Sequence, residues 1–177
     1  CYGPGWATTD QDSKKGNNDC PKPGLYYKIT KAAAAHFKGK ITHWGLWNEP
    51  NLGGFCDCTK QQWVDRIVVE GVKGIKDGCP TCKVLGPELA SVGSKHEEYL
   101  EASILGLQKQ GLMWDIITHH IYSSFVELDI TLLACTGDTF FNDLDSHRKC
   151  MLGPLVIYEG PLSPREVLLK YKLGHLP

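Results

Sequence analysis

Hydrophobic residues recur along one face of residues 59–77, which predicts an amphipathic helix over that range. The face consists of four positions spaced four residues apart: Trp63, Ile67, Gly71 and Ile75. Thr59, with Gln62 three residues later, makes the capping box that often begins a helix. Gly78 and Pro80 are residues that commonly end one. We therefore expect a single helix between two turns.

Similar segments alternate along the rest of the chain. Helical periodicity or helix caps predict helices over residues 25–37, after Ser94 and after Ser163. Short apolar segments between turn residues predict strands over residues 41–48, 83–87, 114–120 and 155–159. Because strands and helices alternate, the pattern predicts an α/β fold with a parallel sheet. Residues 8–24 and 123–149 lack a clear period and are expected to be loops.

The carboxyl ends of the predicted strands carry polar groups that could do chemistry. In a parallel sheet flanked by helices, binding and catalytic residues gather at that end of the strands. The residues expected there are Asn48, Glu49, Glu88, His119, His120, Tyr122 and Glu159. Carboxylates, imidazoles and a phenol would therefore meet at one edge, and this set suits acid–base chemistry.

Length and charge narrow the classes of function. A chain of 177 residues is long enough for one domain with a sizeable core. Its formal net charge of -1 gives no electrostatic reason to expect a nucleic acid or an anionic membrane as partner. No apolar run approaches the roughly 18 residues of a transmembrane helix. Residues 1–6 lack the basic and apolar regions of a signal peptide.

Eight cysteines are many for this length, and they stand at Cys1, Cys20, Cys56, Cys58, Cys79, Cys82, Cys135 and Cys150. An even number at scattered positions favours disulfides and an oxidising compartment over free cytosolic thiols. A zinc site shared by residues 56–58 and 79–82 is disfavoured, because a helix about 25 Å long at about 1.5 Å per residue separates them. A redox-active motif at residues 79–82 would follow a strand and open a helix, the reverse of its predicted place.

The segment around Glu49 resembles a known catalytic motif. Residues 47–52 read Trp-Asn-Glu-Pro-Asn-Leu, which resembles the fourth-strand motif of clan A glycoside hydrolases, most closely family 39 and then family 5. Four other segments resemble the exit of the third strand and the fifth, sixth and seventh strands of these families. They occur in the family's order, one before and three after the motif: residues 4–7, 85–89, 114–122 and 155–160. The resemblance implies a (β/α)8 barrel of the TIM type. Residues 1–177 would form one partial catalytic domain, from the end of strand three to helix seven.

The resemblance also implies a role for each of four residues. Glu49 would be the acid/base and Glu159 the nucleophile of a retaining glycosidase, whose carboxyl groups lie about 5–5.5 Å apart. Asn48 would bind the 2-hydroxyl of the sugar being cleaved, a contact that strengthens in the transition state. Tyr122 would donate a hydrogen bond to the nucleophile and keep it oriented.

Four further residues have a structural interpretation, which for two of them stands beside a functional one. His120 would bind substrate or tune the acid/base, and its alternative is a core histidine. His119 is expected to be structural, because side chains alternate along a strand. Trp6 would stack on a sugar face, although tryptophans more often lie in cores. Glu88 is expected to be a salt-bridged structural residue.

The sequence departs from the family in two ways. Tyr158 and Gly160 flank Glu159, where the family usually has Thr or Ser before the nucleophile and an aromatic residue after it. Strands one, two and eight have no counterpart, and a complete barrel takes about 250 residues. Either the chain is a fragment, or another copy completes the open barrel as a homo-oligomer, or disulfides hold a reduced architecture.

The expected activity is hydrolysis of a β-linked polysaccharide or oligosaccharide by double displacement, in a secreted protein with no metal or organic cofactor. The alternative is a non-catalytic secreted protein, carbohydrate-binding or structural, that kept this fold. Spacing does not fix the disulfide connectivity. The candidate arrangement pairs Cys79 with Cys82 and Cys135 with Cys150, and cross-links the first loops through Cys1, Cys20, Cys56 and Cys58.

Overall fold

The structure, a computed structural model, describes residues 3–8, 18–90, 94–120 and 164–176. Its elements in chain order are η1 (Gly5–Ala7), α1 (Leu25–His36), β1 (His43–Gly45), α2 (Lys60–Trp63), η2 (Val64–Val69), α3 (Glu70–Gly78), β2 (Lys83–Ala90), α4 (Ser94–Gln108), β3 (Ile116–His120) and α6 (Pro164–Lys170). The strand predicted over residues 155–159 lies outside the described residues. None of the described helices is long and apolar enough to cross a membrane.

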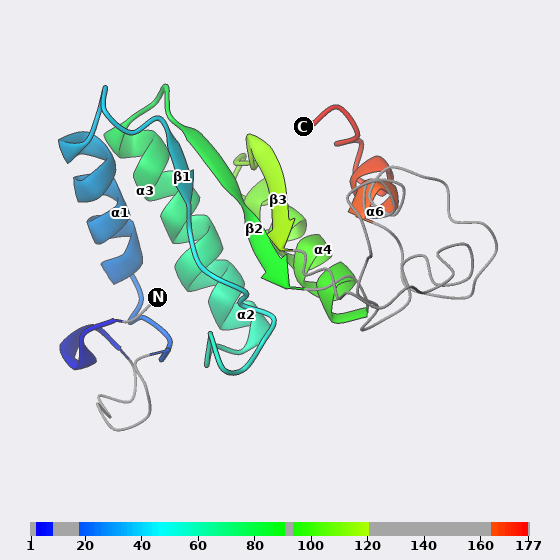
Figure 1. The fold of residues 1–177 in the computed structure, drawn as a ribbon, viewed down its shortest axis with the longest axis horizontal. Coiled ribbons are helices and arrows are strands. Elements are labelled where there is room, and N and C mark those ends of the chain that lie inside the picture. The colour runs from blue at the N-terminus through cyan, green and yellow to red at the C-terminus, as the bar shows by residue number, and fades with distance from the viewer. Residues whose placement is uncertain (1–2, 9–17, 91–93, 121–163, 177) are drawn as a thin grey trace, which may run out of the picture.

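Three strands form one parallel sheet in the order β1–β2–β3. His43 pairs with Lys83, and Leu85 pairs with Ile116, so the carboxyl ends of all three strands lie at one edge. Figure 1 shows α3 and α4 behind the strands, with α1 beside α3. The parallel α/β arrangement predicted from the alternation is confirmed for these strands. The described part of the chain does not show a closed barrel.

The helix predicted over residues 59–77 is continuous, as α2, the π-helical segment η2 and α3. The predicted capping box is present: the Thr59 hydroxyl accepts from the Gln62 N–H at 3.2 Å, and Gln62 Oε1 accepts from the Thr59 N–H at 3.0 Å. The predicted apolar face is buried at all of its positions: Trp63, Ile67, Gly71 and Ile75. This helix therefore presents one side to the sheet along its whole length.

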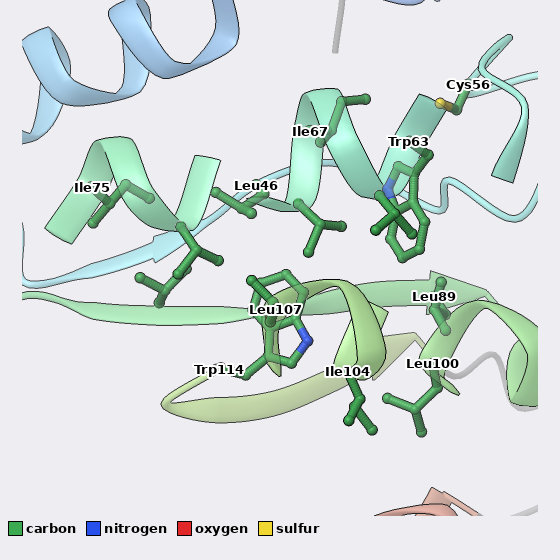
Figure 2. Close-up of a cluster of buried hydrophobic side chains, with 14 of the residues drawn as sticks. Leu46, Cys56, Trp63, Ile67, Ile75, Leu89, Leu100, Ile104, Leu107 and Trp114 are labelled. Carbon is green, nitrogen blue, oxygen red and sulfur yellow. The ribbon is translucent and has the colours of Figure 1, made fainter. Parts of the chain in front are cut away.

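The main core lies between this helix, the sheet and α4. Leu100, Ile104 and Leu107 of α4 are fully buried, and Figure 2 shows them in one cluster with Trp63 and Ile67. Burying a side chain of this size stabilises a protein by about 1.5–3 kcal/mol. The core fixes the strands, and so it fixes the direction of the polar residues that follow them.

Glycines let α1 approach α3 closely. A Cβ atom at Gly74 would lie 2.1 Å from Thr30 Oγ1 and 2.7 Å from the backbone oxygen of Tyr27. A Cβ atom at Gly78 would lie 2.4 Å from the backbone oxygen of Lys31. Since backbone atoms of α1 cannot move aside easily, any larger residue at these two positions would separate the helices.

Two disulfides are present among the described residues, Cys20–Cys58 and Cys79–Cys82. The predicted local pair is therefore confirmed, and two of the four cysteines expected to cross-link the first loops do so. Cys56 is buried and unpaired, and its burial raises its pKa to about 11. The predicted partners Cys1, Cys135 and Cys150 lie outside the described residues.

Asp115 joins three elements at the amino end of the sheet. Its carboxylate accepts from Lys76 Nζ at 2.7 Å, and from the N–H of Val84 at 2.8 Å. Burial by itself would raise the pKa of Asp115, but the hydrogen bonds from Lys76 and Val84 and the charge of Lys76 lower it. A carboxyl group with a lowered pKa stabilises the folded state above its unfolded-state pKa. This stabilisation is lost as the pH falls through the folded-state pKa.

We expect Asp115→Asn to lower the free energy of unfolding by about 1–3 kcal/mol at neutral pH. The difference from the wild type should shrink as the solution becomes acidic, because Asp115 of the wild type then takes up a proton. Urea unfolding at a series of pH values measures both effects. Asp77→Asn is the control, because the exposed pair of Asp77 with Lys73 is expected to contribute less than about 1 kcal/mol. A loss independent of pH would contradict the assignment.

Candidate active site

Two carboxylates and an imidazole meet at the carboxyl end of the sheet. Glu49 follows β1 and is 4% exposed, Glu88 lies in β2, and His120 is the last residue of β3. Nδ1 of His120 lies 2.9 Å from Oε1 of Glu49, and its Nε2 lies 3.3 Å from Oε2 of Glu88. The sequence placed all three residues at strand ends, and the structure brings them into contact through the parallel sheet.

The backbone at both carboxylates is in the left-handed region. Glu49 has a φ of 45° and Glu88 a φ of 58°. Such a conformation costs a residue other than glycine about 1–3 kcal/mol, and it is found mainly where a site requires it. The pairing of β2 with β3 shifts register between Pro87 and Leu89, so Glu88 sits at an irregularity that redirects its side chain. The N–H of Glu49 donates to the backbone oxygen of Glu88 at 3.0 Å, which links the segment after β1 to β2.

Gly45 has no side chain, and this leaves the space that the Glu88 carboxylate occupies. A Cβ atom at Gly45 would lie 2.8 Å from Oε1 of Glu88, closer than a real side chain could stay. The glycine is the last residue of β1, two strands away from His120 in the sheet order. The carboxylate therefore lies over the end of β1 while its other oxygen faces the imidazole.

Asn51 fastens the loop after β1 to the end of β2. Its side chain donates to the backbone oxygen of Ala90 at 2.7 Å and accepts from the N–H of Ala90 at 2.9 Å. The side chain is almost fully buried, so both bonds are shielded from water. Sequence reasoning gave Asn51 no role, although it stands in the Asn-Glu-Pro-Asn motif. Its position two residues after Glu49 was the available signal.

An apolar pocket of about 700 Å³ is lined in part by Leu46 and Trp47, which precede Glu49 in the chain. The N-terminal segment, α1 and the end of β1 line it, and the lining includes Trp6, Tyr26 and Trp47 but not Glu49 or the residues that contact it. Trp6 is 72% exposed. The Trp47 indole N–H donates to the Phe55 backbone oxygen at 2.8 Å, which fixes the ring at the rim. Trp6 is therefore placed in the pocket rather than against the carboxylates.

The remaining predicted residues differ in what the structure says of them. Asn48 is half-buried directly before Glu49. The ring of His119 packs edge-on against His96 of α4, with ring centroids 5.3 Å apart, so the two neighbouring histidines of β3 have different partners, as alternation predicted. The predicted nucleophile Glu159 and its predicted partner Tyr122 lie outside the described residues.

A metal site is not evident in the described ranges, where no three His, Cys, Asp or Glu side chains gather in a metal-binding arrangement. The His120 ring instead contacts the carboxylates of both Glu49 and Glu88. A carboxylic acid held against an imidazole can give and take a proton, and this is the chemistry that the arrangement supports.

Neither a protein-family model nor a curated protein matches the sequence. Solved structures do share the fold. A glucosidase from Croceicoccus marinus aligns with a TM-score of 0.59 at 14% identity, over 85% of this chain and 28% of that one. A monomeric beta-xylosidase from Caulobacter crescentus CB15 aligns with a TM-score of 0.52 at 22% identity, over 69% and 24%. A GH39 beta-xylosidase from Caulobacter crescentus aligns with a TM-score of 0.51 at 22% identity, over 68% and 27%.

This chain therefore spans less than a third of the length of the glycosidases with which it aligns. Likeness at these identities concerns the fold, which agrees with the resemblance seen in residues 47–52 and in the order of the other segments. The chain has a clan A glycoside hydrolase-like fold, and it corresponds to only a part of the complete fold of these enzymes.

Proposed function

We propose that this chain belongs to a secreted retaining glycoside hydrolase that cleaves a β-linked polysaccharide or oligosaccharide, with Glu49 as acid/base and Glu159 as nucleophile. One observation carries the proposal: the Glu49 carboxyl is buried at the carboxyl end of β1 and contacts His120 at the end of β3. A buried carboxyl group next to a titratable partner is suited to proton transfer. The glycosidase-like fold supports this placement, because catalytic residues of such folds lie at the carboxyl ends of strands.

The proposed reaction has two steps. Glu49 gives its proton to the glycosidic oxygen while the Glu159 carboxylate attacks the anomeric carbon, which forms a covalent glycosyl-enzyme and releases the first product. Glu49, now ionised, then takes a proton from a water molecule that attacks the same carbon and frees Glu159. Asn48 would hold the 2-hydroxyl throughout, and Tyr122 would keep the nucleophile oriented. No cofactor is needed for either step.

Two features of the surroundings support the proposed substrate class and compartment. Trp6 and Trp47 line the apolar pocket, and their aromatic faces would suit the apolar sides of sugar rings. The Cys20–Cys58 and Cys79–Cys82 disulfides support an oxidising compartment, and so a protein that acts outside the cytosol.

The test is hydrolysis of a panel of β-glycans and aryl β-glycosides by the wild type, Glu49→Gln and Glu159→Gln. We expect product release by the wild type, with the anomeric configuration retained in the first product seen by NMR, and severe losses in both variants. Glu98→Gln, which removes an exposed carboxylate paired with Lys60, is the control. Activity that survives both substitutions, or an inverted product, would contradict the proposal. Glycan binding without any product would favour the non-catalytic carbohydrate-binding alternative.

A further inference from the structure

The geometry points to Glu88 as a positioning residue for the acid/base: it fixes a proton on Nε2 of His120, so that Nδ1 is the nitrogen that faces Glu49. This inference rests on the proposed function, because it gives Glu88 a part in the chemistry of Glu49. Sequence reasoning treated Glu88 as a structural ion-pair residue. The residue it pairs with is the one that contacts the proposed acid/base.

The His120 imidazole has a different carboxylate at each of its two nitrogens. A neutral imidazole has one N–H donor and one acceptor nitrogen, whereas an ionised carboxylate only accepts. The Glu88 side chain is 18% exposed and that of Glu49 is 5% exposed, so water solvates the Glu88 carboxylate better. In the proposed reaction Glu49 begins as the acid and carries a proton, which it can donate to an unprotonated Nδ1. The single proton of the neutral ring then lies on Nε2, the nitrogen that faces Oε2 of Glu88 at 3.3 Å.

Glu88 is held in place through both its backbone and its side chain. Its backbone oxygen accepts from the N–H of Glu49 at 3.0 Å, so the two residues are joined through the main chain as well. Gly45 leaves room for Oε1 of Glu88, where any side chain would displace the carboxylate. Among the described residues, the titratable groups facing His120 are Glu49 after β1 and Glu88 in β2, while His119 turns to His96 of α4.

The consequence concerns both steps of the proposed reaction. Glu49 must present its carboxyl group in one orientation, first as an acid and then as a base. The ring cannot rotate to bring Nε2 toward Glu49 without breaking the contact between Nε2 and Glu88. His120 then holds Glu49 through Nδ1 while Glu49 is the acid. Once Glu49 has given up its proton, the same contact requires a second proton on the ring, at Nδ1. Glu88 acts on the chemistry only through that ring.

The experiment combines two substitutions with two readouts on the full chain. Glu88→Met keeps the length of the side chain but removes the carboxylate, and Gly45→Ala keeps the carboxylate but displaces it. Nitrogen NMR of the histidine rings at neutral pH reports which nitrogen of His120 carries the proton. We expect Nε2 to be protonated in the wild type and its proton occupancy to fall in both variants. We also expect kcat to fall about tenfold with little change in KM, the effect of losing one hydrogen bond to a charged group.

Glu88→Asp should recover part of the loss, because it restores a carboxylate at a shorter reach. Glu98→Gln is the matched control and should change neither readout. An unprotonated Nε2 in the wild type, or an unchanged Nε2 in both folded variants, would overturn the inference. The NMR readout needs no turnover, so it separates failure of this inference from failure of the proposed hydrolase activity. Wild-type protein that hydrolyses nothing, yet loses the Nε2 proton in both variants, would support Glu88 and contradict only the proposed function.

Discussion

Glu49→Gln should slow hydrolysis of natural β-glycans by about 10²–10⁴-fold, the contribution that general acid–base catalysis makes. An alkoxide leaves slowly without a proton, and glutamine has no proton to give at this position. Aryl β-glycosides whose phenols are acidic leave without such help. Their first step should therefore lose much less, and the phenol should appear as a burst followed by a slow steady rate.

The slow phase in this variant gives a second measurement. Hydrolysis of the glycosyl-enzyme needs a base for the attacking water, whereas a small anionic nucleophile such as azide needs none. We expect added azide to accelerate Glu49→Gln but not the wild type, and to give a glycosyl azide of retained configuration. The same treatment should leave Glu98→Gln unchanged. Equal losses on glycans and on activated aryl glycosides would show that Glu49 has another role.

The sequence predicted the elements that depend on regular local patterns. The spacing of Trp63, Ile67 and Ile75 is helical, and the cap at Thr59 marks where the helix begins, so the long helix was predicted almost to the residue. Glu49 and His120 were predicted at one edge because parallel strands bring their carboxyl ends together.

Other features depend on contacts between distant segments and carry no local signal. The strand expected over residues 41–48 pairs only from His43 to Gly45, where β2 is its neighbour. The sequence predicted a salt-bridged Glu88 but not its partner His120, because nothing in residues 83–87 reveals the register shift at this position. The burial of Asn51 depends likewise on the end of β2. Such contacts are set by the sheet as a whole.

The Cys20–Cys58 disulfide joins the N-terminal segment to the loop that follows β1. Both sulfurs are almost fully buried, and the loop of Cys58 also contains Asn51 and the Phe55 oxygen that holds Trp47. The bridge therefore has two expected effects. It lowers the conformational entropy of the unfolded chain. It also holds in place the loop that carries Trp47, which lines the apolar pocket.

We expect Cys20→Ala with Cys58→Ala to lower the free energy of unfolding by about 4 kcal/mol, the chain-entropy value for a sequence separation of 38 residues. The control is Cys79→Ala with Cys82→Ala, which opens a separation of only 3 residues and should cost about 2 kcal/mol. Both cysteines of each pair are replaced so that no new thiol can exchange with Cys56, whose raised pKa of about 11 keeps it protonated at neutral pH. Urea unfolding of the oxidised proteins measures the difference. Equal losses for the two pairs would contradict the loop-length argument and indicate that native-state packing around the sulfurs sets the stabilisation.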